Sequence, residues 1–237
     1  MNIDQFWSLI AAARSEAGER VHPQFPSRFV TAVEALLVKL APQEIVDFDA
    51  RRYELYKQSD RPGLRAANRL VDTKAGHLST PSPAFFSGLL SLGRETFEGA
   101  LADADSLYWE PVMRAIAEGQ LPADRLLLSE LTAAAGHCYA KRDDGSGEFG
   151  DLVAARLWEE PDDTGLDEDT EEGPWDGDPA QVQTRLPKLS AMFAARTAAE
   201  RFGAPRRPLG AFGWILVFAA VLIAAFMISL IDRASER

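Results

Sequence analysis

Apolar residues recur every three or four positions along about the first 140 residues, which is the spacing of one face of an α-helix. The pattern predicts helices over about 4–17, from about 27 and from 42, and then through 64–71, 85–101, 106–116 and 126–135. The segment 85–101 is the most apolar of them and is expected to form the core. No alternating pattern of useful length predicts a strand, so the sequence predicts one all-α helical domain over residues 1–158.

Glycine, proline and serine mark the expected helix ends. Gly18 suits the end of the first helix, and Pro42 suits the first turn of the third. Pro62 and its neighbouring glycine break the chain, and the short helix after them is expected to end at Gly76. Ser106 is expected to cap the helix that runs through residue 116.

A run of 24 residues without a charge stands near the C-terminus, from Pro208 to Ile231. About 20 apolar residues cross the hydrocarbon core of a bilayer as a helix. Leu, Ile, Phe and Val are expected to favour insertion by about 4–8 kcal/mol in total, and Trp214 suits the membrane interface. A buried core helix, the alternative, would keep a polar stripe, which this run lacks. Residues 208–231 are therefore predicted to form one transmembrane helix, followed by a tail at 232–237.

Lysine and arginine are more numerous before the predicted span than after it. Five stand upstream (Lys188, Arg196, Arg201, Arg206 and Arg207) and two downstream (Arg233 and Arg237). Because the side richer in these residues stays in the cytoplasm, the helical domain is predicted to be cytoplasmic. Without a signal peptide at the N-terminus, the predicted layout is a tail-anchored, single-pass protein of the cell membrane. A single unpaired cysteine, Cys138, agrees with a reducing compartment.

One feature of the predicted span favours self-association. Ala220 and Ala224 form a small-xxx-small pair, which permits close packing and a homodimer of spans. The alternative is that alanine is simply common in such helices.

The negative charge of the chain is concentrated in one segment. Lys and Arg total 25 against 36 Asp and Glu, a net charge of -11, which disfavours nucleic acid as a partner. Eleven of the acids fall within residues 159–178, where no base occurs. We expect residues 159–181 to form an acidic, disordered linker. Docking to a basic partner or loose binding of a divalent cation are the alternatives. The residues from Asp167 onward do not match an EF-hand calcium-binding loop, because Glu172 occupies the position that requires glycine.

The next segment, 182–207, has a net positive charge. Six bases oppose one acid, Glu200, and Leu186, Leu189 and Phe193 form an apolar stripe. The sequence predicts a basic amphipathic stem beside the membrane. Its contacts with anionic lipid or a partner are expected at Arg196, Arg201, Arg206 and Arg207. Pairing with the acidic linker is one alternative, and fixing the topology alone is another.

No set of residues predicts catalysis, a cofactor or a metal site. Phosphate-binding glycine loops and the common hydrolase motifs do not occur, and the single cysteine and three histidines lack metal-ligand spacing. His137 and Cys138 are neighbours on a predicted helix and would point about 100° apart. Asp47 and Asp49 are expected to face solvent.

Four elements of the sequence resemble one uncharacterised bacterial family. They are Phe6-Trp7-x-Leu9-Ile10, the segment 42–48, the segments 93–98 and 102–107 together, and Trp175-Asp176 followed by 185–189. In this order they resemble the family called domain of unknown function 4240, over roughly residues 1–193. The resemblance implies a helical cytosolic module without catalytic residues to carry over.

The chain departs from that family in its middle. An Asp-Leu-Trp element and a Cys-Ser-Asp-Asp element are replaced here by residues 61–64 and 77–83. If those elements form a shared site, this chain has lost it. The resemblance also implies that Trp175 docks the stem back onto the domain across the acidic linker.

Two functions of different class follow from the sequence. The first is a non-enzymatic, membrane-tethered module that binds or recruits a protein partner at the cytoplasmic face. The alternative is a hydrolase-like enzyme with an unrecognised site. A deep pocket that gathers His137 with carboxylates from other helices would favour the enzyme.

Overall fold

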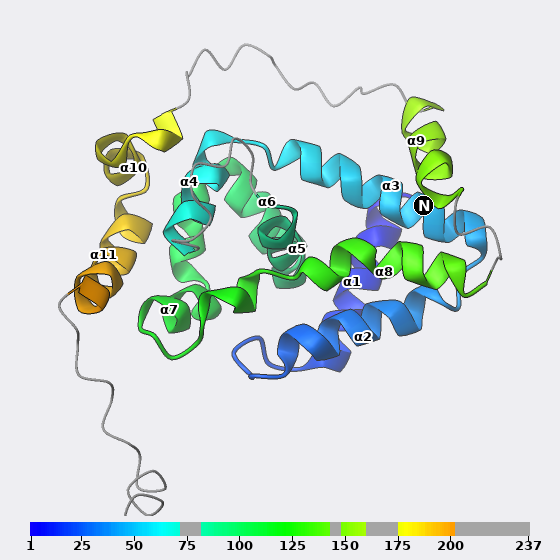
Figure 1. Ribbon diagram of the computed structural model, residues 1–237, viewed down its shortest axis with the longest axis horizontal. Coiled ribbons are helices and arrows are strands. Elements are labelled where there is room, and N and C mark those ends of the chain that lie inside the picture. The colour runs from blue at the N-terminus through cyan, green and yellow to red at the C-terminus, as the bar shows by residue number, and fades with distance from the viewer. Residues whose placement is uncertain (72–81, 143–147, 160–174, 202–237) are drawn as a thin grey trace, which may run out of the picture. The chain divides into compact units, whose positions relative to one another are not determined.

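The computed structural model describes residues 1–71, 82–142, 148–159 and 175–201, and these ranges hold helices and no strand (Figure 1). The all-α prediction is confirmed for them. The α-helices are α1 (Ile3–Ala17), α2 (Phe25–Leu37), α3 (Pro42–Gln58), α4 (Pro62–Val71), α5 (Pro83–Leu92), α6 (Arg94–Ala102), α7 (Pro111–Ala117), α8 (Ser129–Ala140), α9 (Phe149–Glu159), α10 (Pro179–Arg185) and α11 (Pro187–Arg201). Three 3₁₀ turns join them: η1 (Ala104–Trp109), η2 (Ala123–Leu126) and η3 (Trp175–Gly177).

The chain divides into two units, Met1–Arg196 and Thr197–Arg237. The predicted start of the stem, residue 182, lies inside the first unit. Within the described residues, no helix has both the length and the apolar character needed to cross a membrane. The predicted span 208–231 and the tail 232–237 lie outside the described residues, as do residues 160–174 of the predicted linker. The prediction of disorder is wrong for its described residues, because Glu159 ends α9, 175–177 form η3 and α10 begins at Pro179.

Local sequence explains several of the helix starts. The Asn2 side chain accepts a hydrogen bond from the Gln5 amide at 2.8 Å, and the Gln5 side chain returns one to the Asn2 amide at 2.9 Å. This reciprocal capping satisfies two amides that the first turn of α1 leaves free. Pro42, Pro83 and Pro111 each occupy the first position of a helix, where the missing N–H carries no penalty.

The predicted bounds of two helices are wrong. The segment 85–101 is broken at Gly93, whose φ of 97° ends α5 before α6 begins. A Cβ at Gly93 would stand 1.8 Å from a terminal nitrogen of the Arg14 side chain, which would have to move aside. Ser106 does not cap a helix through residue 116: Asp103 caps η1, and α7 begins only at Pro111.

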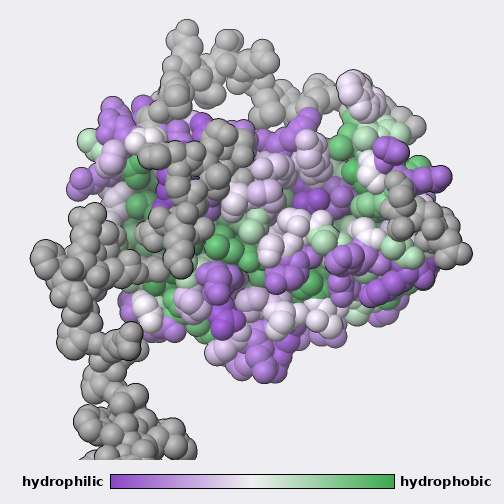
Figure 2. Space-filling model, viewed as in Figure 1, coloured by the Kyte–Doolittle hydropathy of each residue, from purple (hydrophilic) through white to green (hydrophobic). Residues whose placement is uncertain are grey.

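Aromatic side chains fill the centre of the first unit. The ring of Phe6 stacks on Phe48 at 5.0 Å, and Phe97 contacts Trp7 at 5.5 Å and Phe86 at 5.8 Å. Every residue of α5 from 85 to 92 is buried, which confirms the expectation that this segment forms the core. The described surface is mostly hydrophilic in the view of Figure 2, with apolar residues in smaller areas between.

Candidate interaction site

A short stretch near the C-terminal end of the first unit packs on the helical domain. We call residues 176–193 the docked segment. Val182, Leu186, Leu189 and Phe193 are its buried apolar residues, at 9% exposure or less. Val182 lies in α10 and Leu186 directly after it, while Leu189 and Phe193 lie four residues apart on one face of α11. Both η3 and α10 contact α4, and Figure 1 shows α10 beside it.

Asp176 fastens the start of the docked segment to α4. Its carboxylate accepts hydrogen bonds from Arg69 and from Nε of Arg65, the latter at 3.2 Å. Arg69 also donates to the main-chain carbonyl of Asp176. Arg65 pairs in turn with Asp60 at 2.6 Å. Two arginines one helical turn apart thus hold one side chain and its backbone.

The Asp176 carboxylate is held in its charged form. Its side chain is only 4% exposed. Burial alone would raise the pKa of Asp176, but the hydrogen bonds and positive charges of Arg69 and Arg65 outweigh it and lower the pKa below the usual value. The contact therefore persists at neutral pH.

Asp105 fastens the second helix of the docked segment. This buried residue of η1 accepts hydrogen bonds from the amides of Leu189 at 2.8 Å and Lys188 at 3.2 Å. Both amides lie in the first turn of α11, behind Pro187, which has no N–H to satisfy. Asp105 is thus an N-cap supplied from elsewhere in the chain, and its charge suits the helix N-terminus.

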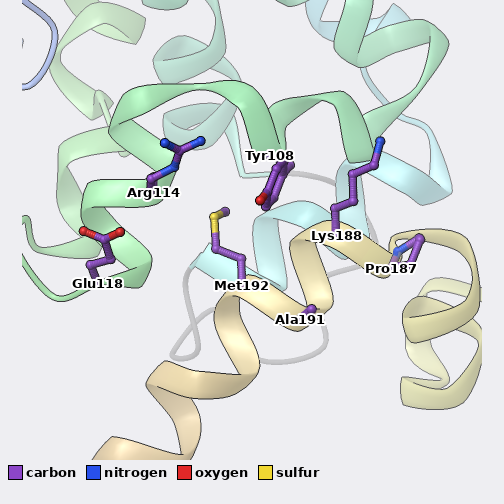
Figure 3. Close-up of a pocket in the computed structure, with 7 residues that line it drawn as sticks. All are labelled: Tyr108, Arg114, Glu118, Pro187, Lys188, Ala191 and Met192. Atoms are coloured by element: carbon purple, nitrogen blue, oxygen red, sulfur yellow. The ribbon is translucent and has the colours of Figure 1, made fainter.

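An open groove of about 520 Å³ lies between η1, α7 and α11. It is lined by Tyr108, Arg114, Glu118, Pro187, Lys188, Ala191 and Met192. In Figure 3 the Tyr108 ring lies between Arg114 and Lys188 and above Met192. The Arg114 guanidinium is 5.9 Å from the centre of this ring, and Lys188 Nζ is 5.6 Å from that of Trp109, which is 65% exposed. We call this the Tyr108 groove.

A second groove, of about 330 Å³, borders the docked segment at Leu186. Residues 61–64 and 100–104 line its other walls. We call it the Pro62 groove.

Glu110 is the centre of a separate polar cluster. It pairs with Arg20 at 2.5 Å and accepts a hydrogen bond from Thr96 at 2.7 Å. Arg14 lies against Gly93, and its pKa is lowered by burial first and by the charge of Arg20 second. The two partners of Glu110 come from the turn after α1 and from α6, so the cluster joins elements that are distant in sequence.

The residues predicted to contact a partner or lipid fall at the margin of the described chain. Arg196 and Arg201 lie on α11, but their side chains are outside the described part, and so are Arg206 and Arg207 entirely. Trp175 begins η3, and its side chain is likewise not described. The contact described at this point is made by its neighbour Asp176.

Sequence reasoning missed the three residues that hold the docked segment, namely Arg65, Arg69 and Asp105. The sequence contains a feature that could have pointed to each of these residues. The arginines are four positions apart on an expected helix, and Asp105 lies in the third element of the family resemblance. Nothing local, however, connects them to residues more than 80 positions away.

The alternative of an enzyme finds no support at His137. This residue is exposed on α8 and lines none of the grooves described. Its neighbour Cys138 is buried, with Sγ 3.7 Å from the Glu34 carbonyl oxygen, and burial raises the pKa of the thiol. A thiol held protonated is a poor nucleophile. Among the described residues, no group of three His, Cys, Asp or Glu side chains is placed to hold a metal ion.

The expectation that Asp47 and Asp49 face solvent is wrong. Asp47 accepts a hydrogen bond from Arg156 at 3.0 Å and pairs with the amino group of Met1. Burial works to raise the pKa of Asp47, but these two groups lower it. Asp49 is 9% exposed and pairs with Arg52 at 2.7 Å. Asp47 is covered because α9, which the hydrophobic pattern did not predict, packs on α3.

These features define an all-α domain. Arg65, Arg69 and Asp105 of this domain bind the docked segment, which comes from the C-terminal side of the same chain, through hydrogen bonds and ion pairs. The chain belongs to the family described as Protein of unknown function (DUF4240), whose profile matches residues 1–141. Comparisons with curated proteins and with solved structures found no match. Arg65, Arg69 and Asp105 lie inside the matched range, whereas the docked segment lies beyond it.

Proposed function

We propose that the chain is a single-pass, tail-anchored membrane protein whose cytoplasmic helical domain binds a protein partner at the membrane. The uncharged run 208–231 supports the span, and the excess of Lys and Arg before it supports the orientation. A homodimer through Ala220 and Ala224 belongs to the same proposal.

The observation that carries the proposal is the attachment of α11 to the domain. Asp105 and the buried Leu189 and Phe193 fix the first half of this helix. Only 14 residues, 194–207, separate Phe193 from the predicted span. Residues 194–201 continue α11, so the stretch spans at most about 33 Å even if residues 202–207 were fully extended. A domain tied to its stem in this way stays close to the bilayer, where a membrane-associated partner is concentrated.

The basic residues of the stem add a second attraction. Arg196, Arg201, Arg206 and Arg207 precede the predicted span directly. A basic residue near an anionic surface contributes about 1 kcal/mol. The acidic linker that precedes the docked segment is repelled by the same surface, which favours a domain held off the headgroups. Residues 160–174 then act as a solvated connection.

Protease protection in spheroplasts tests this proposal. The chain carries a tag at Met1, and the membranes are washed in alkaline carbonate. We expect the tag to stay with the washed membranes and to be protected. A tag that washes off would refute the span, and a tag that is cleaved would refute the orientation.

A matched pair of variants tests the role of the stem. Changing Arg196, Arg201, Arg206 and Arg207 to Gln removes the charge bias and is expected to reduce the protected fraction. Changing four exposed bases of the domain (Arg28, Lys39, Arg61 and Lys141) to Gln keeps the same net charge and is expected to leave protection unchanged. Partner capture is then compared between the full chain and a chain that lacks 208–231.

A further inference from the structure

We infer that the surface around the Tyr108 groove binds the headgroups of an anionic bilayer and gives the domain a contact with the membrane of its own. We call this surface the Trp109 face, and its members are Val21, Tyr108, Trp109, Arg114, Lys188 and Met192. The inference rests on the proposed function, because the bilayer concerned is the one that the predicted span 208–231 crosses. It goes beyond that proposal because most of this face belongs to the domain, whereas the expected basic contacts lie at 196–207 in the stem.

Two positive charges of the Trp109 face have no acidic partner. Among the described residues, Arg114 and Lys188 form no ion pair. The Arg114 guanidinium lies 5.9 Å from the centre of the Tyr108 ring, and Lys188 Nζ lies 5.6 Å from that of Trp109. An aromatic ring attracts a cation but does not neutralise it. Both charges are therefore available to anions from outside the chain.

The acids nearest to this face already have donors. Glu118, which lines the Tyr108 groove, accepts a hydrogen bond from Gln120 at 2.6 Å. Glu110 is paired with Arg20, and Asp105 accepts the amides at the start of α11. The groove thus has two bases against one acid, although the whole chain carries a net charge of -11. An anionic surface is attracted to this face while most of the chain is repelled from it.

The placement of the two charges suits an extended anionic surface rather than one small anion. In Figure 3, Arg114 and Lys188 lie on opposite sides of the Tyr108 ring and do not converge on one point. A site for a single phosphate or carboxylate would bring its charged donors together on that group. A layer of headgroups can meet separated charges one by one.

Exposed apolar side chains accompany these charges. Trp109 is 65% exposed beside Lys188. A second open hollow, of about 440 Å³, shares Arg114 with the Tyr108 groove and is bordered by Val21, which is 40% exposed. Trp109 and Val21 are two of the four large apolar residues exposed in the described part of the chain. An indole beside long basic side chains is typical of residues that lie at a membrane interface.

The course of the chain brings this face near the bilayer. Lys188 and Met192 lie on α11, and only six residues, 202–207, separate the end of this helix from the predicted span. One wall of the Tyr108 groove is thus part of the helix that leads to the membrane. Because the acidic linker is repelled by the same headgroups, the domain is expected to lie against the bilayer only where anionic lipid is abundant.

Quenching of Trp109 by brominated lipids tests the inference. The full chain is placed in nanodiscs of phosphatidylcholine alone, or of phosphatidylcholine and phosphatidylglycerol in equal parts. The Trp109 signal is the difference between the unaltered chain and Trp109→Phe, and the Trp214 signal is obtained in the same way from Trp214→Phe. We expect Trp109 to be quenched with phosphatidylglycerol and much less without it, and we expect high salt to reverse the quenching.

A matched pair of double variants tests the charges themselves. Arg114→Gln with Lys188→Gln is expected to shift the equilibrium between the bound and the free face by roughly 30-fold toward the free state. Lys39→Gln with Lys141→Gln removes the same charge at exposed positions near the ends of α2 and α8, away from α11 (Figure 1). This control is expected to leave the quenching of Trp109 unchanged. Circular dichroism checks that both variants keep their helices, and the salt dependence tests the unaltered chain.

The outcomes separate this inference from the proposed function. Equal quenching of Trp109 in both lipids, or equal loss in the two double variants, would overturn the inference, since the contact would not depend on these charges. An unquenched Trp109 together with a quenched Trp214 would overturn it in favour of an acidic protein partner and leave the span intact. A quenched Trp109 together with an unquenched Trp214 would refute the span and retain the face as a peripheral membrane contact.

Discussion

Phe97 and Leu189 are both almost fully buried, yet different neighbours hold them in place. Phe97 lies between the rings of Trp7 and Phe86 in the centre of the domain. Leu189 is held on the domain by Asp105 through its own main-chain amide. Both regions bury apolar side chains, but the docked segment is held in addition by hydrogen bonds to the charged side chains of Arg65, Arg69 and Asp105. The difference predicts that loss of these charged partners loosens the segment more than the centre.

The largest effect on the free energy of unfolding is expected from a substitution in the core. Phe97→Ala removes most of a ring that is 1% exposed, and it should lower the free energy of unfolding by about 3–5 kcal/mol. Urea denaturation followed by circular dichroism measures the change. Tyr53→Ala is the control, because Tyr53 is 41% exposed and should cost less than about 1 kcal/mol. Local release of residues 182–193 by Phe97→Ala, with the rest folded, would break the comparison.

A smaller and more local effect is expected at Asp105. Asp105→Ala leaves the amides of Lys188 and Leu189 without an acceptor, which should destabilise docking by about 1–2 kcal/mol. The protection of residues 186–193 against hydrogen exchange is expected to fall about tenfold or more, while α5 keeps its protection. Asp105→Asn retains an acceptor oxygen and should restore part of the protection. Equal losses in α5 and α11 would mean that the two regions form one cooperative unit.

The sequence predicts the core better than it predicts the docking. Helical periodicity locates α1, α3 and α5 because the information is local: an apolar stripe, a proline at the first turn and a glycine after the last. It misplaces the break at Gly93, since the apolar spacing continues across it and only the backbone conformation reveals the turn.

The docking depends on contacts that no local pattern contains. Arg69 meets Asp176 across 107 positions, and Asp105 meets Leu189 across 84. The stripe of Leu186, Leu189 and Phe193 was visible, but an apolar stripe before a predicted span suits a membrane surface as well as a protein groove. The structure shows these three residues buried on the domain. Asp47 teaches the same point, because its burial comes from a helix whose sequence pattern is weak.

The pH dependence of docking sharpens the comparison further. The pKa of Asp176 is below the usual value in the folded chain, so the unfolded chain binds more protons. Its contribution to stability is therefore complete above about pH 4 and is lost as the pH falls through the folded pKa. Carboxyl NMR titration should show the low pKa directly. Asp176→Asn should flatten the acid limb of the stability curve.

The smallest effect is expected at Trp109, although it is the largest side chain beside the docked segment. Its ring is 65% exposed, and Lys188 stacks on it through solvent-accessible atoms. A cation–π contact of this kind contributes about 0.5–1 kcal/mol. Trp109→Ala should therefore change the hydrogen exchange of residues 186–193 by less than about fivefold. If it released the segment as fully as Asp105→Ala does, surface packing rather than buried hydrogen bonds would hold the segment. The contrast between core and docked segment would then be one of degree only.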